Sequence, residues 1–263
     1  MLSHLLLLFS CILYFSLLTM QTLTGKVVLI VGGGSGIGLS TGVAFAREGA
    51  KVVLAARTAS SLADAKKLPG VGSSFLTKTC DAADRSQVAD LVTWTAKEAG
   101  PIDVLVYCAG VNVPKRSFAD VSPADFDHVM TINATGAFNC LHAVLPAMRA
   151  RKAGLIINVV SVAGRRGLPL AGLPYSAAKF AQAAIGTFAN LEVHADNVRV
   201  TNIYPGEVET PILEKRPVKP TAEHRARMLQ PEDVADMAVA VAKLPPRAVV
   251  QELVIAPLYQ PQP

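Results

Sequence analysis

Lys26-Val27-Val28-Leu29-Ile30-Val31 runs directly into Gly32-Gly33-Gly34-Ser35-Gly36-Ile37-Gly38, so a short apolar segment ends in a glycine-rich loop. The apolar segment is long enough for a strand buried in a parallel sheet. The sequence then predicts a helix over residues 39–48 and a second strand over residues 51–56. This order is typical of a dinucleotide-binding unit, because glycines let backbone N–H groups approach a pyrophosphate and the helix N-terminus adds partial positive charge. The alternative interpretation is a plain flexible loop.

A second pattern lies far downstream, in Tyr175-Ser176-Ala177-Ala178-Lys179, with Ser161 before it. In a helix, positions four apart share one face, so the ammonium of Lys179 is expected near the phenol of Tyr175. A nearby positive charge favours the phenolate and should lower the pKa of Tyr175 from its usual value of about 10. Tyr175 is therefore a candidate general acid/base. Alone, the pattern also fits a surface tyrosine beside a solvated lysine.

Together, the glycine spacing of Gly32, Gly36 and Gly38 and the Ser161, Tyr175 and Lys179 set resemble the short-chain dehydrogenase/reductase family. The resemblance covers roughly residues 24–256. It implies an α/β fold, a single doubly wound Rossmann-type domain over residues 21–263 with a mostly parallel seven-stranded sheet. It also implies an oxidoreductase that interconverts a secondary alcohol and a carbonyl by hydride transfer with a nicotinamide cofactor.

The family's pattern assigns roles to individual positions. Ser161 would hydrogen-bond the substrate carbonyl, Tyr175 would protonate it, and Lys179 would hold the ribose. Asn133 resembles the helix asparagine that holds a proton-relay water. Other positions match cofactor-binding residues of the family: Gly32, Ser35, Gly36, Ile37, Gly38, Asp81, Ala109, Gly110, Pro205, Gly206, Val208 and Thr210.

Three departures from the family's pattern affect this assignment. Val31 stands where threonine is usual, and Tyr107-Cys108 replaces two asparagines before Ala109. The lost side chains are mainly structural tethers, so the rigidity of the turns is in question more than the chemistry. Ser161 also lies one residue further from Tyr175 than usual, which an extra residue in the loop over 164–174 would explain.

The end of the second strand indicates the cofactor. Enzymes that prefer NAD(H) place a carboxylate there, where it binds the ribose 2′-hydroxyl and repels a 2′-phosphate. Here the position is Ala56, followed by Arg57, whose guanidinium suits a phosphate. Ser35 could add a hydroxyl. The sequence therefore predicts NADP(H) as the preferred cofactor and NAD(H) as the second choice.

The rest of the chain alternates between strands and helices, which implies a parallel sheet. Strands are expected over residues 74–80, 102–107, 155–160, 198–204 and 251–256. Helices are expected over residues 86–99, 174–194 and 231–244, and from Ser122 toward Arg151 with a break. The segment 211–227, rich in proline and charge, is interpreted as a mobile cover over the substrate site.

Composition narrows the class of partner. The chain has 263 residues, 51% of them hydrophobic, and a net charge of +5 without a basic stripe, which argues against nucleic-acid binding. Cys11, Cys80, Cys108 and Cys140 lack metal-ligand spacing and are interpreted as free thiols in a reducing compartment. A small-molecule substrate is expected. It could be anionic, because several basic residues follow strands or lie in the cover: Lys115, Arg116, Arg165, Arg166, Lys215 and Arg216.

Residues 1–20 form a separate, almost wholly apolar segment. Three interpretations compete: a membrane anchor, a signal sequence, or a start of translation at Met20. The anchor is favoured, because no basic residue precedes the segment and no cleavage site is evident. It predicts a membrane-associated protein facing a reducing compartment, whereas a start at Met20 predicts a cytoplasmic one. A homodimer or homotetramer is expected.

A different class of function also fits the motifs. The chain could be a catalytically idle dinucleotide-binding protein that senses redox state or holds partners together. Such a protein needs no acid/base, so the intact set of Asn133, Ser161, Tyr175 and Lys179 favours the enzyme.

Overall fold

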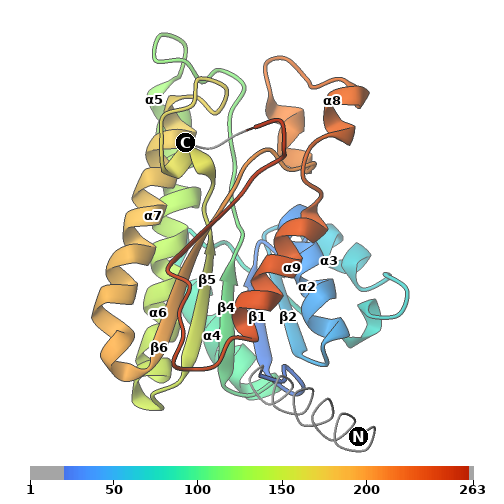
Figure 1. Cartoon of the computed structure of the whole chain (residues 1–263), viewed down its shortest axis with the longest axis vertical. Helices are drawn as coiled ribbons and strands as arrows, with labels where there is room; N and C mark the ends of the chain where they lie inside the picture. Colours follow the sequence, from blue (N-terminus) through green and yellow to red (C-terminus); the bar gives the residue numbers. More distant parts are fainter. Residues whose placement is uncertain (1–20, 261–263) are drawn as a thin grey trace, which may run out of the picture.

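A parallel sheet forms the centre of the molecule (Figure 1). The computed structural model describes residues 21–260, and the predictions for residues 1–20 lie outside them. In this part of the chain the sheet has seven strands: β1 (Val27–Val31), β2 (Lys51–Ala56), β3 (Leu76–Thr79), β4 (Ile102–Tyr107), β5 (Gly154–Val159), β6 (Val198–Pro205) and β7 (Glu252–Ile255). Their order is β3-β2-β1-β4-β5-β6-β7, and every neighbouring pair is parallel. The predicted doubly wound fold is confirmed, and all strands rather than most are parallel.

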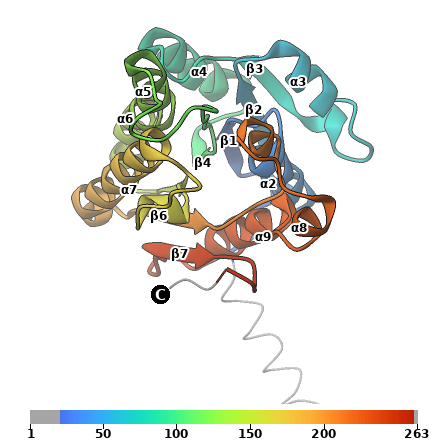
Figure 2. The same cartoon turned by 90° about the horizontal axis from the view of Figure 1, so that it is seen from above.

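Helices cover both faces of the sheet, as the view from above shows (Figure 2). The core on one face includes side chains of α2, α3 and α9, and the core on the other face includes side chains of α4, α6 and α7. The helices are α2 (Gly36–Arg47), α3 (Ala59–Ala65), α4 (Arg85–Glu98), α5 (Pro123–Met130), α6 (Gly136–Ala150), α7 (Leu173–Val193), α8 (Ala222–Ala226) and α9 (Pro231–Ala242). Within residues 21–260, none of the helices has the length and the apolar content that crossing a membrane requires.

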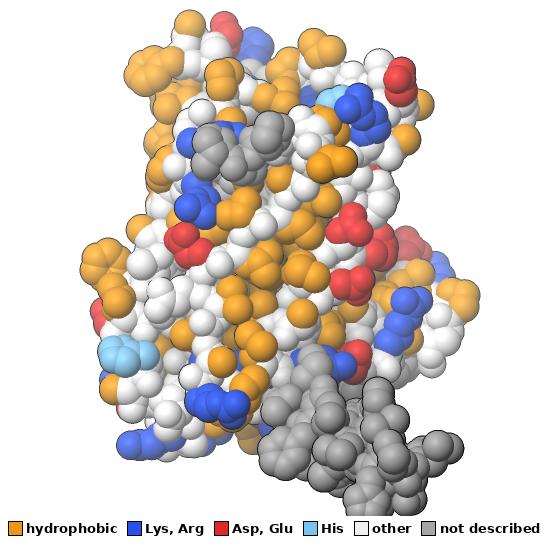
Figure 3. All heavy atoms as spheres, in the orientation of Figure 1, with side chains coloured by type: hydrophobic (Ala, Val, Ile, Leu, Met, Phe, Trp, Pro, Cys, Tyr) orange, Lys and Arg blue, Asp and Glu red, His pale blue; other side chains and the backbone are white. Residues whose placement is uncertain are grey.

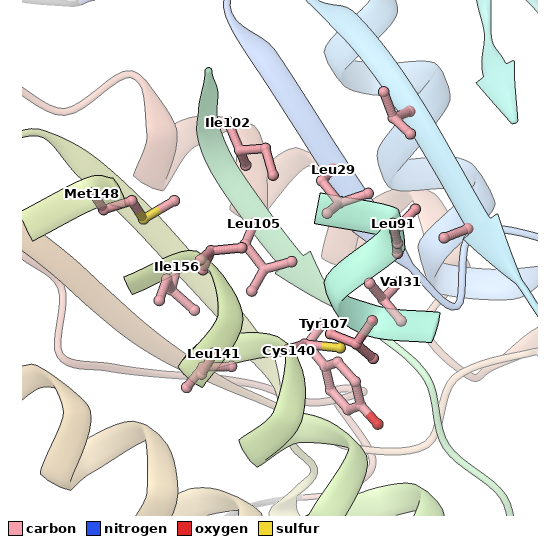
Figure 4. Close-up of a cluster of buried hydrophobic side chains, with 14 of the residues drawn as sticks. Leu29, Val31, Leu91, Ile102, Leu105, Tyr107, Cys140, Leu141, Met148 and Ile156 are labelled. Atoms are coloured by element: carbon pink, nitrogen blue, oxygen red, sulfur yellow. The ribbon is translucent and has the colours of Figure 1, made fainter. Parts of the chain in front are cut away.

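The β1 strand explains why the central strands are apolar throughout. Its alternate residues point to opposite faces, so Leu29 and Val31 join one core, and Val28 and Ile30 join the other. Figure 4 shows the first of these cores, in which strand residues pack against α4 and α6. A sheet buried on both faces holds its strand ends, and therefore the loops that follow them, in fixed positions.

Several boundaries differ from the predictions. Helix α2 begins at Gly36, inside the glycine loop, rather than after it. The third strand is shorter than residues 74–80, because Gly72–Ser74 form a 3₁₀ turn and β3 pairs with one neighbour only, at the edge of the sheet. Helix α3 was not predicted, since its seven residues show no clear apolar period.

The predicted break between α5 and α6 is a π-helical turn over Thr131–Thr135. Tyr107, at the end of β4, donates a hydrogen bond to the carbonyl of Ile132 in this turn, at 2.6 Å. Gly136 follows the turn, and a Cβ atom there would lie 2.5 Å from the Tyr107 hydroxyl. The tyrosine that departs from the family's pattern therefore fills a space that a glycine leaves open.

The carboxyl ends of the strands lie at the upper end of the molecule in Figure 1, together with α5 and α8. The predicted cover reaches this end as a 3₁₀ turn, Pro211–Lys215, followed by α8. Its mobility stays a prediction. Lys and Arg side chains are scattered over the face drawn in Figure 3 rather than gathered in a stripe.

Candidate active site

Two adjoining hollows open at the carboxyl ends of the strands. We call the first the glycine cleft, because the loop after β1 forms its wall. We call the second the inner cavity; its volume is about 160 Å³, and it lies beside Ser161 and Tyr175. The two hollows adjoin, because six residues line both: Ile37, Cys108, Gly110, Asn112, Thr210 and Ile212.

The predicted cofactor-binding residues line these two hollows. The glycine cleft is lined by Gly32, Ser35, Gly36, Ile37, Gly38, Arg57, Asp81, Ala109, Gly110 and Thr210. The inner cavity is lined by Tyr175, Lys179, Pro205, Gly206 and Val208, and by Ser161. Positions far apart in the sequence therefore meet at one edge of the sheet, as a parallel fold requires.

The glycine loop packs more closely than any side chain would allow. Gly32 has a φ of +88°, and a Cβ atom there would lie 2.5 Å from the backbone nitrogen of Ala109. A Cβ atom on Gly38 would lie 2.2 Å from the carbonyl oxygen of Gly32. Gly36 begins α2 with a φ of +51°, a conformation that favours glycine. The loop thus presents bare backbone at a helix N-terminus, which is the chemistry that a pyrophosphate needs.

The lining of the glycine cleft includes an arginine and an aspartate that follow neighbouring strands. Arg57 follows β2 and is exposed, and Ala56 before it supplies no carboxylate. Asp81 follows β3 and lines the same cleft, and its carboxylate accepts a hydrogen bond from the backbone of Ala83 at 3.0 Å.

Ser161 and Tyr175 meet in the inner cavity. Ser161 follows β5; its hydroxyl accepts a hydrogen bond from the backbone of Ala163 at 3.1 Å and is hydrogen-bonded to Tyr175 in the first turns of α7. The extra residue in the intervening loop therefore does not separate the two hydroxyls.

Burial dominates the electrostatics of Tyr175. It raises the pKa of the phenol to about 12, while the hydrogen bond from Ser161 and the positive charge of Arg116 act in the opposite direction. Arg116 supplies the positive charge that acts on the phenol among the described residues, and the lowering of this pKa by Lys179 stays a prediction.

Lys179 is near Tyr175, as the helical spacing predicts, but its ammonium is engaged elsewhere. The nitrogen lies 5.6 Å from the centre of the Tyr175 ring. It donates hydrogen bonds to Gln182 at 2.7 Å and to the carbonyl of Val159 at 3.2 Å. Because Lys179 is 3% exposed, burial lowers its pKa to about 7. Its charge is therefore only partly present near neutral pH.

Sequence reasoning missed Gln182, which belongs to a buried amide cluster beneath Lys179. Gln182 donates to the Asn158 side chain at 2.6 Å, and Asn158 donates to Asn202 at 2.9 Å. A Cβ atom on Gly186 would lie 2.0 Å from the Asn202 amide oxygen, so the cluster fills the space beside α7. The available signal was spacing, because Gln182 lies three residues after Lys179 on the same helix face.

Asn133 lies in the π-helical turn and is fully buried. Its amide accepts from the backbone N–H of Val111 at 2.8 Å and donates to the carbonyl of the same residue at 3.0 Å. It is absent from the described lining of both hollows. The side chain fixes the loop after β4, and the water relay stays a prediction.

Of the six basic residues considered for the mouth, Arg116 and Arg216 line the inner cavity and Lys215 lines the glycine cleft. The other three, Lys115, Arg165 and Arg166, are absent from both described linings.

Glu207 was not singled out from the sequence, yet it joins three segments at the inner cavity. Its carboxylate accepts from Tyr259 at 2.7 Å, lies 2.6 Å from the His224 ring and lies 3.4 Å from Arg216. These contacts connect the cover to the segment after β7.

Comparison with known proteins supports one family. The family model for short chain dehydrogenases matches residues 26–220. A glycine betaine reductase of Emericella nidulans is 36% identical over 91% of this chain, but the match spans only 19% of that protein. The 3-oxoacyl-(acyl-carrier-protein) reductase FabG of Thermotoga maritima is 35% identical over 84% of this chain and 91% of its own length.

Solved structures agree with this assignment. The closed form of serine dehydrogenase complexed with NADP+ superposes with a TM-score of 0.83 and 28% identity, over 90% of this chain and 97% of that one. The 3-ketoacyl-(acyl-carrier-protein) reductase of Brucella melitensis complexed with NADH gives 0.80 and 26%, over 89% and 98%. The chain belongs to the short-chain dehydrogenase/reductase family, a family of NAD(P)-dependent oxidoreductases.

Proposed function

We propose that this protein interconverts a secondary alcohol and a carbonyl compound, with Tyr175 as the acid/base. The meeting of the Ser161 and Tyr175 hydroxyls in a cavity that adjoins the glycine cleft is the observation that carries the proposal. In the reduction direction, Ser161 hydrogen-bonds the substrate carbonyl and Tyr175 donates its proton to the carbonyl oxygen. Below its pKa of about 12 the phenol carries the proton that this step transfers, and the interactions with Ser161 and Arg116 lower that pKa and so assist the transfer.

The glycine cleft fits a nicotinamide dinucleotide, which would supply or accept the hydride when bound. Gly36 begins α2 without a side chain, so a pyrophosphate could approach the backbone at the N-terminus of this helix. Arg57 and Ser35, with no carboxylate at Ala56, favour a 2′-phosphate, so we propose NADP(H) over NAD(H). Of the two similar solved structures described above, one is a complex with NADP+ and the other a complex with NADH. We therefore keep NAD(H) as the second candidate for the cofactor.

Lys179 and Asn133 have supporting roles in this proposal. Lys179 lies in the cavity wall beside Tyr175 and would bind the ribose hydroxyls. Asn133 fixes Val111 and thereby the loop that carries Ala109 and Gly110, and it would take part in the water relay.

The organisation of the chain is part of the same proposal. We assign residues 21–263 to the oxidoreductase domain and residues 1–20 to membrane contact. A homodimer or homotetramer is supported by large exposed side chains on α6 and α7, among them Phe138, Phe188 and Leu191. We also propose an anionic substrate, because Arg116 and Arg216 line the inner cavity.

The experiment is a screen of secondary alcohols and ketones with both nicotinamides, using the natural chain and Tyr175→Phe. General acid/base catalysis contributes about 10²- to 10⁴-fold, so the variant should lose nearly all turnover and still bind cofactor. Retention of more than roughly a tenth of the rate would exclude Tyr175 as the acid/base. Absence of hydride transfer to any member of the panel would favour the idle sensor or scaffold.

A further inference from the structure

Arg116 is a buried arginine in the wall of the cavity that holds the reacting groups. Arg116 is 7% exposed and lines the inner cavity together with Ser161 and Tyr175. Its charge favours the ionised form of Tyr175, and the phenol in turn favours the charged guanidinium. The two side chains are therefore close enough to influence each other electrostatically.

The position of Arg116 is fixed by the loops around it. Its guanidinium donates to the carbonyls of Val113 at 2.8 Å, Leu170 at 3.2 Å and Lys215. Gly172, with a φ of +81°, packs against the stem so closely that a Cβ atom there would lie 2.5 Å from the Arg116 Cβ. Three loops thus hold the guanidinium before any ligand arrives, which is the preorganisation that a specific site needs.

The charge of Arg116 has no acidic partner in residues 21–260, since no carboxylate lies within ion-pair distance of it there. The three hydrogen bonds go to backbone carbonyls and use three of the five N–H groups of a guanidinium. Burial and the nearby positive charge of Arg216 lower the pKa of Arg116. Burying an uncompensated charge is costly, and an anionic ligand would compensate it.

The second arginine of the cavity does not reverse this balance. The Arg216 side chain is 13% exposed and pairs with Glu207 at 3.4 Å. Glu207 also binds His224 and Tyr259, so its negative charge is shared among several donors. The charged residues in the described cavity wall are Arg116, Lys179, Glu207 and Arg216, which favours a negatively charged ligand.

We propose that Arg116 is the residue that selects the substrate by binding a carboxylate, so that the substrate class is small oxo acids and the corresponding hydroxy acids. The inner cavity, at about 160 Å³, is close to the roughly 150 Å³ of an engineered cavity that binds benzene, so a small acid fits in it. A carboxylate suits the fork of a guanidinium. The inference rests on the proposed function. In the reduction, the carbonyl carbon of the substrate gains the hydride that the reduced nicotinamide gives up, so the nicotinamide is oxidised. The carbonyl oxygen gains the proton of Tyr175, and the substrate carboxylate is unchanged.

The test compares each oxo acid with its methyl ester, which keeps the carbonyl and loses the charge. The probes are pyruvate and acetoacetate, each against its ester, with the natural chain, Arg116→Gln and Arg116→Lys. The natural chain should favour the acids in kcat/KM. Arg116→Gln should lower the ratio of acid to ester by about 10- to 150-fold, the effect of losing a hydrogen bond to a charged group. Arg116→Lys, which keeps the charge but not the fork, should give an intermediate ratio.

The control is Lys115→Gln, because Lys115 precedes Arg116, is exposed and is absent from the described cavity lining. It should leave the ratio unchanged. If the natural chain turns over ketones and esters without favouring acids, or if Arg116→Gln leaves the ratio as it was, the carboxylate inference is wrong, while the proposed interconversion of alcohol and carbonyl stands.

If no carbonyl compound is reduced, the proposed function fails, and carboxylate binding is read from melting temperatures instead. Acetoacetate should raise the melting temperature of the natural chain but not that of Arg116→Gln. Where Arg116→Gln does not fold, the same comparison is made with Arg116→Lys, for which the rise should be smaller. Equal shifts in the variant and the natural chain, or no shift in either, would refute the inference.

Discussion

Lys179→Met should change how the stability of this protein depends on pH. The natural lysine is buried, and its pKa falls from 10.5 to about 7. Between these two values the unfolded chain binds a proton that the folded chain lacks, so stability rises with pH across this window. Methionine has a similar length and no charge, and it removes this dependence.

The size of the effect follows from the shift. Each pKa unit corresponds to about 1.36 kcal/mol, so the burial of charged Lys179 costs on the order of 5 kcal/mol below about pH 7. The cost declines as pH rises toward 10.5. The free energy of unfolding of the natural chain, relative to Lys179→Met, should therefore increase by about 2–3 kcal/mol between roughly pH 6 and pH 9.

The assay is urea unfolding of the cofactor-free protein, followed by the fluorescence of Trp94, the only tryptophan in the sequence. Lys66→Met is the matched control, because Lys66 is exposed at the end of α3, and its loss should not alter the pH dependence of stability. A difference between the natural chain and Lys179→Met that stays constant within about 0.5 kcal/mol would refute the argument. The ammonium would then remain charged in the fold without a burial cost.

Three further outcomes are expected. Arg57→Ala should raise the KM for NADP(H) by about 10- to 150-fold through the loss of a charge-assisted hydrogen bond, and an equal change for NAD(H) in steady-state kinetics would contradict a 2′-phosphate contact. Gly186→Ala should lower the free energy of unfolding in urea by about 1–3 kcal/mol, because the added methyl group meets the Asn202 amide 2.0 Å away; unchanged stability would show that the amide cluster rearranges at no cost. A chain begun at Met20 should stay active and leave the membrane fraction of cells that retains the full chain, and a full chain found wholly in the supernatant would exclude the anchor.

The sheet could be predicted because its signal is local. A β-branched run such as Val27–Val31 must be buried on both faces of the sheet, and the helices that alternate with the strands pack on both faces. The glycine loop could also be predicted, because a positive φ and a close approach between backbone segments leave few alternatives to glycine. Short elements such as α3 could not be read this way, because seven residues hold too little periodicity.

The residues that form the candidate site could be predicted from the sequence, but their charge interactions could not. Helical spacing places Lys179 beside Tyr175, and the structure confirms this proximity. Spacing does not reveal competing acceptors, and Gln182 and the carbonyl of Val159 hold the ammonium instead. The burial of Arg116 was also hidden, because it depends on loops that are distant in the sequence.

The contact between Tyr107 and Gly136 constrains how these two positions can be substituted. Any side chain at position 136 would collide with the Tyr107 hydroxyl, 2.5 Å from the added Cβ, whereas a smaller residue at 107 would release the Ile132 carbonyl and open a hole. Each single step is therefore costly, although a joint replacement could be mild, which is the non-additive behaviour of residues in contact. Exchanging the β4 end with a relative should succeed only when the start of α6 is transferred with it.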